Sequence, residues 1–190
     1  MTLMPLLVLC ALLALAVWND VRTRRIPNAL VFGGAALGLL LNGALPPGAG
    51  LLLEPFGGIG WLMALAGLAL GLCLLLPMYA MGALGAGDVK LMAMVGAFVG
   101  PLAVAGITLF TLLAGGVLAL VVAGYHGRLR AMLGNTWQMF KYSALRTLGG
   151  DLAKLEAPAT PSGRLPYAVA IAAGALPYVV AAARSGRSLF

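Results

Sequence analysis

The chain has 190 residues, of which 62% are hydrophobic and only 9% are charged. A soluble domain averages roughly 25% charged residues, so this composition excludes an ordinary water-soluble protein and indicates one membrane-embedded domain over residues 1–190. The net charge of +7 comes from basic residues in short segments between apolar runs, which the positive-inside rule explains without nucleic acid as a partner.

The first predicted membrane helix covers residues 1–18 and holds no charged side chain. With its flanks it is long enough to cross a hydrocarbon core of ~30 Å. Arg22, Arg24 and Arg25 follow this run, whereas a secretory signal peptide carries its positive charges before the apolar stretch. We therefore expect the N-terminus outside and the segment 20–28 in the cytoplasm.

Five further apolar runs complete the predicted architecture, an all-α polytopic bundle of about six transmembrane helices. They cover residues 29–45, 57–81, 89–99, 102–124 and 165–183. The run 89–99 is short for a helix that must cross the bilayer, and the sequence leaves open whether it spans fully.

Two glycine pairs with a four-residue spacing occur in the second and third runs. They are Gly34 with Gly38 and Gly67 with Gly71. Such pairs allow two helices to approach closely within a membrane. Cys10 and Cys73 stand alone in separate apolar runs, which indicates neither a metal site nor a disulfide framework.

Between the fifth and sixth runs lies a basic segment, residues 125–164, with six basic residues against Asp151 and Glu156. This asymmetry predicts a cytoplasmic loop. Apolar residues recur within it at three- and four-residue steps beside basic positions, which predicts an amphipathic helix on the membrane surface. His126 at its start has no partner in the sequence pattern, and we assign it no chemical role. Arg184 and Arg187 would fall outside in a six-span topology.

Asp88 is the most unusual residue, because it is a carboxylate at the mouth of an apolar run in a chain with five acidic residues. An ionisable side chain in a membrane segment costs at least ~2.5 kcal/mol on insertion scales and points to function. Asp88 belongs to the motif Gly85-Ala86-Gly87-Asp88-Val89-Lys90. A purely structural role is equally open, in which Asp88 is the N-cap of a helix that begins at Val89.

Asp20 closes the first run at the cytoplasmic edge, the depth at which Asp88 opens the fourth. Two neighbouring carboxylates cannot both ionise easily, so one of them retains a proton near neutrality. Such a pair can activate a water molecule and protonate a peptide carbonyl. A proton relay or transporter uses similar pairs, and a membrane scaffold of a secretion machine would need neither acid. These alternatives remain open at this point.

Three ordered motifs carry a resemblance to a known family. The Gly85–Lys90 motif, Asp20 with its following arginines and Ile26-Pro27-Asn28, and the late Leu165-Pro166-Tyr167-Ala168-Val169-Ala170-Ile171 together resemble the type IV prepilin peptidases, GxGD-type membrane aspartyl proteases. The resemblance implies that Asp20 and Asp88 are the catalytic pair and that no cofactor or metal is required.

The resemblance also implies a substrate and a location. Members cleave the short basic leader from prepilins or pseudopilins at the cytoplasmic face of the bacterial inner membrane, so a prepilin and the lipid bilayer are the expected partners. Larger members carry an extra segment with paired cysteines and methylate the new N-terminus. This sequence has no such segment, so it resembles the compact Flp/Tad-type peptidases, and only peptidase activity is implied.

Five further residues are expected to shape the site. Gly85 and Gly87 would let an extended substrate backbone approach Asp88. Lys90 would have a structural or interfacial role. Pro166 suits the first turn of a helix and would place the last helix, with Tyr167, near the aspartates. We expect Pro27 and Asn28 to start and cap the second helix.

Overall fold

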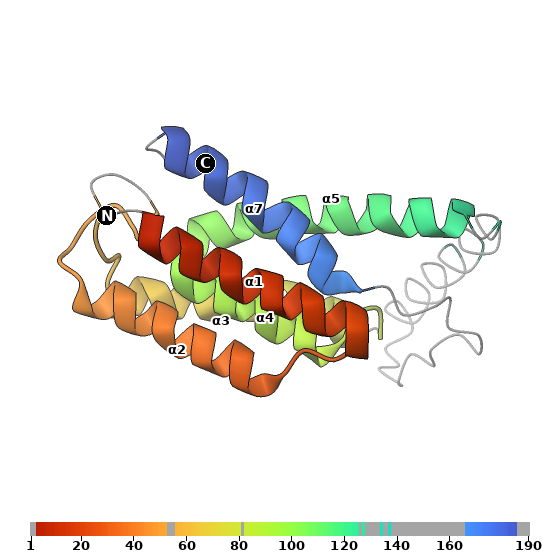
Figure 1. Cartoon of the computed structure of the whole chain (residues 1–190), viewed down its shortest axis with the longest axis horizontal. Helices are drawn as coiled ribbons and strands as arrows, with labels where there is room; N and C mark the ends of the chain where they lie inside the picture. The colour runs from red at the N-terminus through yellow and green to blue at the C-terminus, as the bar shows by residue number, and fades with distance from the viewer. Residues whose placement is uncertain are drawn as a thin grey trace, which may run out of the picture. The chain divides into compact units, whose positions relative to one another are not determined.

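The computed structural model describes residues 3–52, 56–80, 82–125, 127, 134, 137 and 166–185. The residues described form six α-helices and no β-strand beyond two isolated bridges, which confirms the predicted all-α class (Figure 1). The helices are α1 (Leu3–Thr23), α2 (Asn28–Ala44), α3 (Trp61–Ala80), α4 (Ala86–Val99), α5 (Pro101–Tyr125) and α7 (Tyr167–Ser185).

The chain separates into two compact units. The first comprises Met1–Gly115 with Pro166–Phe190, and the second comprises Gly116–Leu165. Most of the second unit, including His126 and the predicted surface helix, lies outside the described residues, so these expectations stay predictions. The organisation as a single domain also stays a prediction.

Three helical segments are long and apolar enough to cross a membrane. They are Met4–Thr23, Trp61–Ala80 and Pro101–Tyr125, and two shorter apolar helices cover Asn28–Ala44 and Tyr167–Ala181. The length and apolar composition of these helices indicate a membrane protein. The six-span topology and its orientation stay predictions.

The end of α1 lies further along the chain than predicted. The helix continues past residue 18 to Thr23, and in this last part Asn19 and Thr23 each form a side-chain hydrogen bond to the carbonyl four residues earlier, on Leu15 and Asn19. It ends where Arg24 adopts a left-handed conformation with φ 53° and its N–H donates to the Asp20 carbonyl at 2.9 Å. Asp20 therefore lies within the last turn of α1 and not in a loop.

Helix α4 is the centre of the first unit. Every residue from Leu91 to Phe98 is buried. A helix that is hydrophobic all round is expected to be enclosed by other helices, and α2 and α3 pack directly against it. The position of α4 determines where its first turn, which carries Asp88, lies.

Glycines hold α3 against α4. Gly67 of α3 lies in backbone contact with Gly96 of α4, and a Cβ atom at Gly71 would lie 2.6 Å from the carbonyl oxygen of Met92. The pair Gly34 and Gly38 makes the same kind of close contact between α2 and α4, with the side chains of Met94 and Phe98. The predicted close packing at both pairs is therefore confirmed.

A buried asparagine secures the other end of α4. The Asn42 side chain, 1% exposed, donates to the carbonyl oxygens of Ala97 at 2.9 Å and Phe98 at 3.2 Å, and accepts the Ile59 N–H at 3.2 Å. The last carbonyls of a helix have no partner within the helix, so Asn42 satisfies two of them in an apolar environment.

Candidate active site

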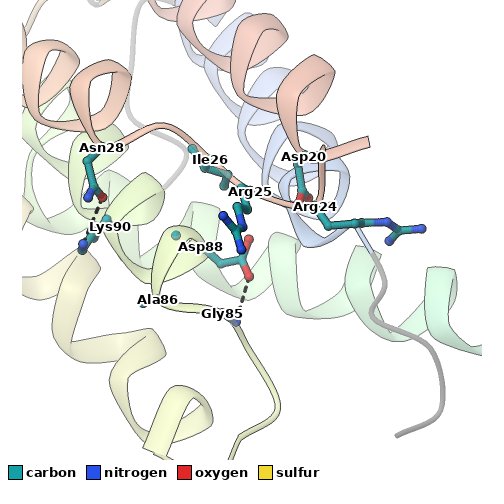
Figure 2. Close-up of a pocket in the computed structure, with 10 residues that line it drawn as sticks. Asp20, Arg24, Arg25, Ile26, Asn28, Gly85, Ala86, Asp88 and Lys90 are labelled. Carbon is teal, nitrogen blue, oxygen red and sulfur yellow. Dashed lines mark hydrogen bonds between the residues drawn. The ribbon is translucent and has the colours of Figure 1, made fainter. Parts of the chain in front are cut away.

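Asp20 and Asp88, far apart in the sequence, line the same pocket (Figure 2). Its volume is about 280 Å³. It is formed by the end of α1, the α1–α2 linker (residues 24–27), and the starts of α2 and α4. The lining residues are Asp20, Arg24, Arg25, Ile26, Asn28, Gly85, Ala86, Gly87, Asp88 and Lys90. Of the residues expected to shape the site, Pro166 and Tyr167 are not part of this lining.

Asp88 is the third residue of α4, so the structural alternative, in which it is the N-cap of a helix beginning at Val89, is wrong. The helix begins at Ala86, and Gly85 is the N-cap. The Asp88 Oδ2 atom accepts the Gly85 N–H at 3.0 Å. An acid at this position commonly folds back onto the N-cap amide, so local helix chemistry orients the carboxylate.

Asp88 is 8% exposed and lies outside the three candidate spans. Burial raises the pKa of Asp88 to about 6, the Gly85 hydrogen bond opposes this rise, and the charge of Asp20 adds to it. Asp88 can therefore keep its proton at a pH where an exposed aspartate has lost it.

Asp20 is 7% exposed, and its Oδ2 atom accepts the backbone N–H of Ala168 at 3.1 Å. Ala168 is the second residue of α7, and first-turn amides have no partner within the helix. The last turn of α1 is thus joined to the first turn of α7. The sequence motifs pointed to Pro166 and Tyr167, whereas the contacting group is the amide of the next residue. Pro166 is a helix-start signal, and it could have indicated that the unpaired first-turn amides of this helix lie just after it.

Gly85 and Gly87 of the motif each leave space that another residue of this protein occupies. A Cβ atom at Gly87 would lie 3.3 Å from the Ile26 Cβ atom, so Ile26 of the α1–α2 linker packs on this glycine. A Cβ atom at Gly85 would lie 3.2 Å from the Asp88 Oδ2 atom. A role of either glycine in admitting a substrate backbone stays a prediction.

Lys90 joins α4 to α2. Its Nζ atom donates to the Asn28 Oδ1 atom at 3.1 Å (Figure 2). The same atom lies 5.3 Å from the centroid of the Phe32 ring. The expectation that Asn28 caps α2 is wrong, because Pro27 occupies the N-cap position and no side-chain cap bond forms. Asn28 holds the start of α2 at Lys90 instead.

Positive charges also line the pocket. Arg24 and Arg25 of the α1–α2 linker are both among its lining residues, whereas the sequence assigned them only to membrane topology. Arg22 does not line it and stacks on Trp18, with 4.4 Å from its Cζ atom to the ring centroid. Both arginines therefore contribute to the pocket as well as to the basic segment after α1.

Within the part of the chain that the structure describes, no group of three or more His, Cys, Asp or Glu side chains could hold a metal ion. The arrangement that the pocket offers is a pair of carboxylates, of which Asp88 has a pKa raised to about 6, with two arginines among the other lining residues.

A family model described as the type IV leader peptidase family matches residues 7–120, more than half of the chain. The matched region contains both Asp20 and Asp88 and ends before α7. No curated protein and no solved structure matches the chain. On the extent of the family match, the chain belongs to the type IV leader peptidase family.

Proposed function

We propose that this chain is an aspartic endopeptidase that removes the short basic leader from Flp-type prepilins or pseudopilins at the cytoplasmic face of the bacterial inner membrane. Membership of the leader peptidase family supports a prepilin substrate in general. The observation that carries the assignment of an aspartic mechanism is that Asp20 and Asp88 line one pocket.

The chemistry follows from the different environments of the two acids. Burial keeps a proton on Asp88 up to a pH of about 6, its pKa. In a dyad with one shared proton, the ionised carboxylate takes a proton from the attacking water while the protonated one donates to the peptide carbonyl oxygen. The two groups act as a unit, so the pH dependence of the reaction belongs to the pair.

The pocket also suits a bond at the boundary between a polar leader and an apolar helix. It lies at the end of one candidate span, Met4–Thr23, beside a run of arginines. A prepilin has its basic leader on one side of such a boundary and its apolar helix on the other. The guanidinium groups of Arg24 and Arg25 do not attract a basic leader, so we assign them no role in binding it.

The test is cleavage of a co-expressed prepilin in membranes, followed by the mass of the product. Asp20→Asn and Asp88→Asn should each reduce cleavage by at least about 10³-fold, because each removes an acid–base group. Asp151→Asn makes the same chemical change outside the motifs and should cleave like the wild type.

Three results would reject the proposal. If either dyad variant cleaves at the wild-type rate, that residue is not catalytic. If prepilin length is unaffected and proton-coupled uptake into proteoliposomes is altered instead, the aspartates belong to a transporter. If Asp20→Asn and Asp88→Asn change neither prepilin cleavage nor proton-coupled uptake, the protein is a scaffold.

A further inference from the structure

We propose that Tyr167 is a positioning residue for Asp20. Its ring lies against Gly115 of α5 and thereby fixes the start of α7 where the Ala168 amide binds the Asp20 carboxylate. This inference rests on the proposed catalytic function of Asp20, and neither Tyr167 nor Gly115 is among the residues that line the pocket.

The first step is the bond between Ala168 and Asp20. The Ala168 N–H lies in the first turn of α7, where no carbonyl of the same helix can accept it. It donates to Asp20 Oδ2 at 3.1 Å, while the next amide, of Val169, already donates to the Pro166 carbonyl at 3.1 Å. Ala168 is fully buried. The location of the α7 start therefore decides where the Asp20 carboxylate is held.

The second step is the contact between α5 and α7. A Cβ atom at Gly115 would lie 2.7 Å from the Cε2 atom and 2.9 Å from the hydroxyl oxygen of Tyr167. The Tyr167 ring thus occupies space that any other residue at position 115 would fill. A shift of α7 along its axis would move the ring off this glycine.

A second close contact fixes the register of the two helices. A Cβ atom at Gly174 of α7 would lie 2.5 Å from the backbone nitrogen and 2.8 Å from the Cα atom of Thr111 of α5. Thr111 and Gly115 are four residues apart and so share one face of α5, and Tyr167 and Gly174 are two turns apart on α7. The two contacts together fix α7 against α5. The residue after Tyr167 is Ala168, whose amide binds Asp20.

The experiment compares purified full-length variants in detergent by prepilin cleavage and by hydrogen exchange of the α7 amides. Gly115→Ala removes the space for the ring, and Tyr167→Leu removes the ring without adding a clash. Gly116→Ala is the matched control, because it makes the same change on the same helix and its Cβ atom would have no neighbour within 4 Å among the described residues.

We expect Gly115→Ala and Tyr167→Leu to lower kcat about 10-fold or more, since small misplacements of a catalytic group are costly. KM should stay within about twofold, because neither residue lines the pocket. The Ala168 amide should exchange faster in both variants and in Asp20→Ala. The double variant Gly115→Ala/Tyr167→Leu should match Tyr167→Leu alone, and Gly116→Ala should match the wild type.

Unchanged kcat or unchanged Ala168 exchange in Tyr167→Leu would overturn the inference, and this variant decides the matter if Gly115→Ala fails to fold. A fall in melting temperature with wild-type kcat would also overturn it, because the contact would then be structural only. Exchange separates this failure from failure of the proposed function. If Asp20→Asn still cleaves prepilin but Asp20→Ala accelerates Ala168 exchange, the anchor stands and the catalytic role of Asp20 falls.

Discussion

Substitution of Gly67 by alanine should displace the helix that carries Asp88. A Cβ atom at Gly67 would touch the Gly96 carbonyl oxygen and lie 2.7 Å from the Gly100 Cα atom and 2.8 Å from its carbonyl carbon. Ordinary contacts begin at 3.4 Å, so the backbone must separate by at least about 0.7 Å (3.4 minus 2.7) at Gly100, and by more at the nearer Gly96 oxygen, to admit the methyl group. The atoms in contact are backbone atoms, which cannot turn away as a side chain can.

The structure sets the size of the effect. Overpacking of a close contact costs about 1–3 kcal/mol. For a chain of this size that corresponds to a melting temperature lower by about 2–12 °C. Because Asp88 lies in the first turn of α4, the same separation moves its carboxylate, and the cleavage rate should fall about 10-fold or more.

Gly33→Ala on α2 is the control, because its Cβ atom would have nothing within 4 Å in the described parts of the chain. Alanine is the better helix former by up to ~1 kcal/mol, so this control should melt at or slightly above the wild-type temperature. The assay is thermal unfolding and prepilin cleavage on the same detergent preparations. If Gly67→Ala melts and cleaves like Gly33→Ala, then α4 is not held by this glycine contact and our account of how Asp88 is positioned is wrong.

Two further predictions concern the pocket itself. The pKa of Asp88 is raised by burial to about 6, so its proton is present below this pH and lost above it. The value of kcat/KM should therefore fall about tenfold per pH unit above the apparent pKa of the dyad. A flat profile from pH 5 to 9 would contradict this mechanism. Asn28→Ala removes the acceptor for Lys90 and loosens the α1–α2 linker, so kcat/KM should fall about 2- to 5-fold, as one exposed hydrogen bond is worth about 0.5–1 kcal/mol. Asn28→Asp keeps an acceptor and should retain wild-type cleavage, and equal losses in both variants would show that the Lys90 bond is irrelevant.

Local features of the sequence were sufficient to predict the helical class and to single out Asp20 and Asp88 as candidates for catalysis. An apolar run long enough to cross a bilayer must form a helix there, because the backbone amides have no other partners. A carboxylate at the edge of such a run is costly enough to stand out without a structure. The glycine spacing that indicates close helix packing is likewise a property of one helix face.

The ends of helices were harder to predict. The first helix was predicted to cover residues 1–18 and the fourth run residues 89–99, whereas α1 continues to Thr23 and α4 begins at Ala86, so that Asp20 and Asp88 both lie inside helices. Helix α1 continues through residues 19–23, most of which are polar, beyond its apolar part, and α4 begins directly after Gly85, its N-cap. Helix ends depend on such individual hydrogen bonds and not on the apolar pattern.

Only the tertiary structure decided what surrounds each aspartate. The Ala168 amide reaches Asp20 from the last helix, Ile26 fills the space in front of Gly87, and Asn28 is the partner of Lys90. None of these pairs is marked by composition or spacing, because each joins segments that are brought together by the packing of whole helices around α4. The sequence alone therefore determined which groups are the candidates for catalysis, and the packing of helices determined how those groups are held.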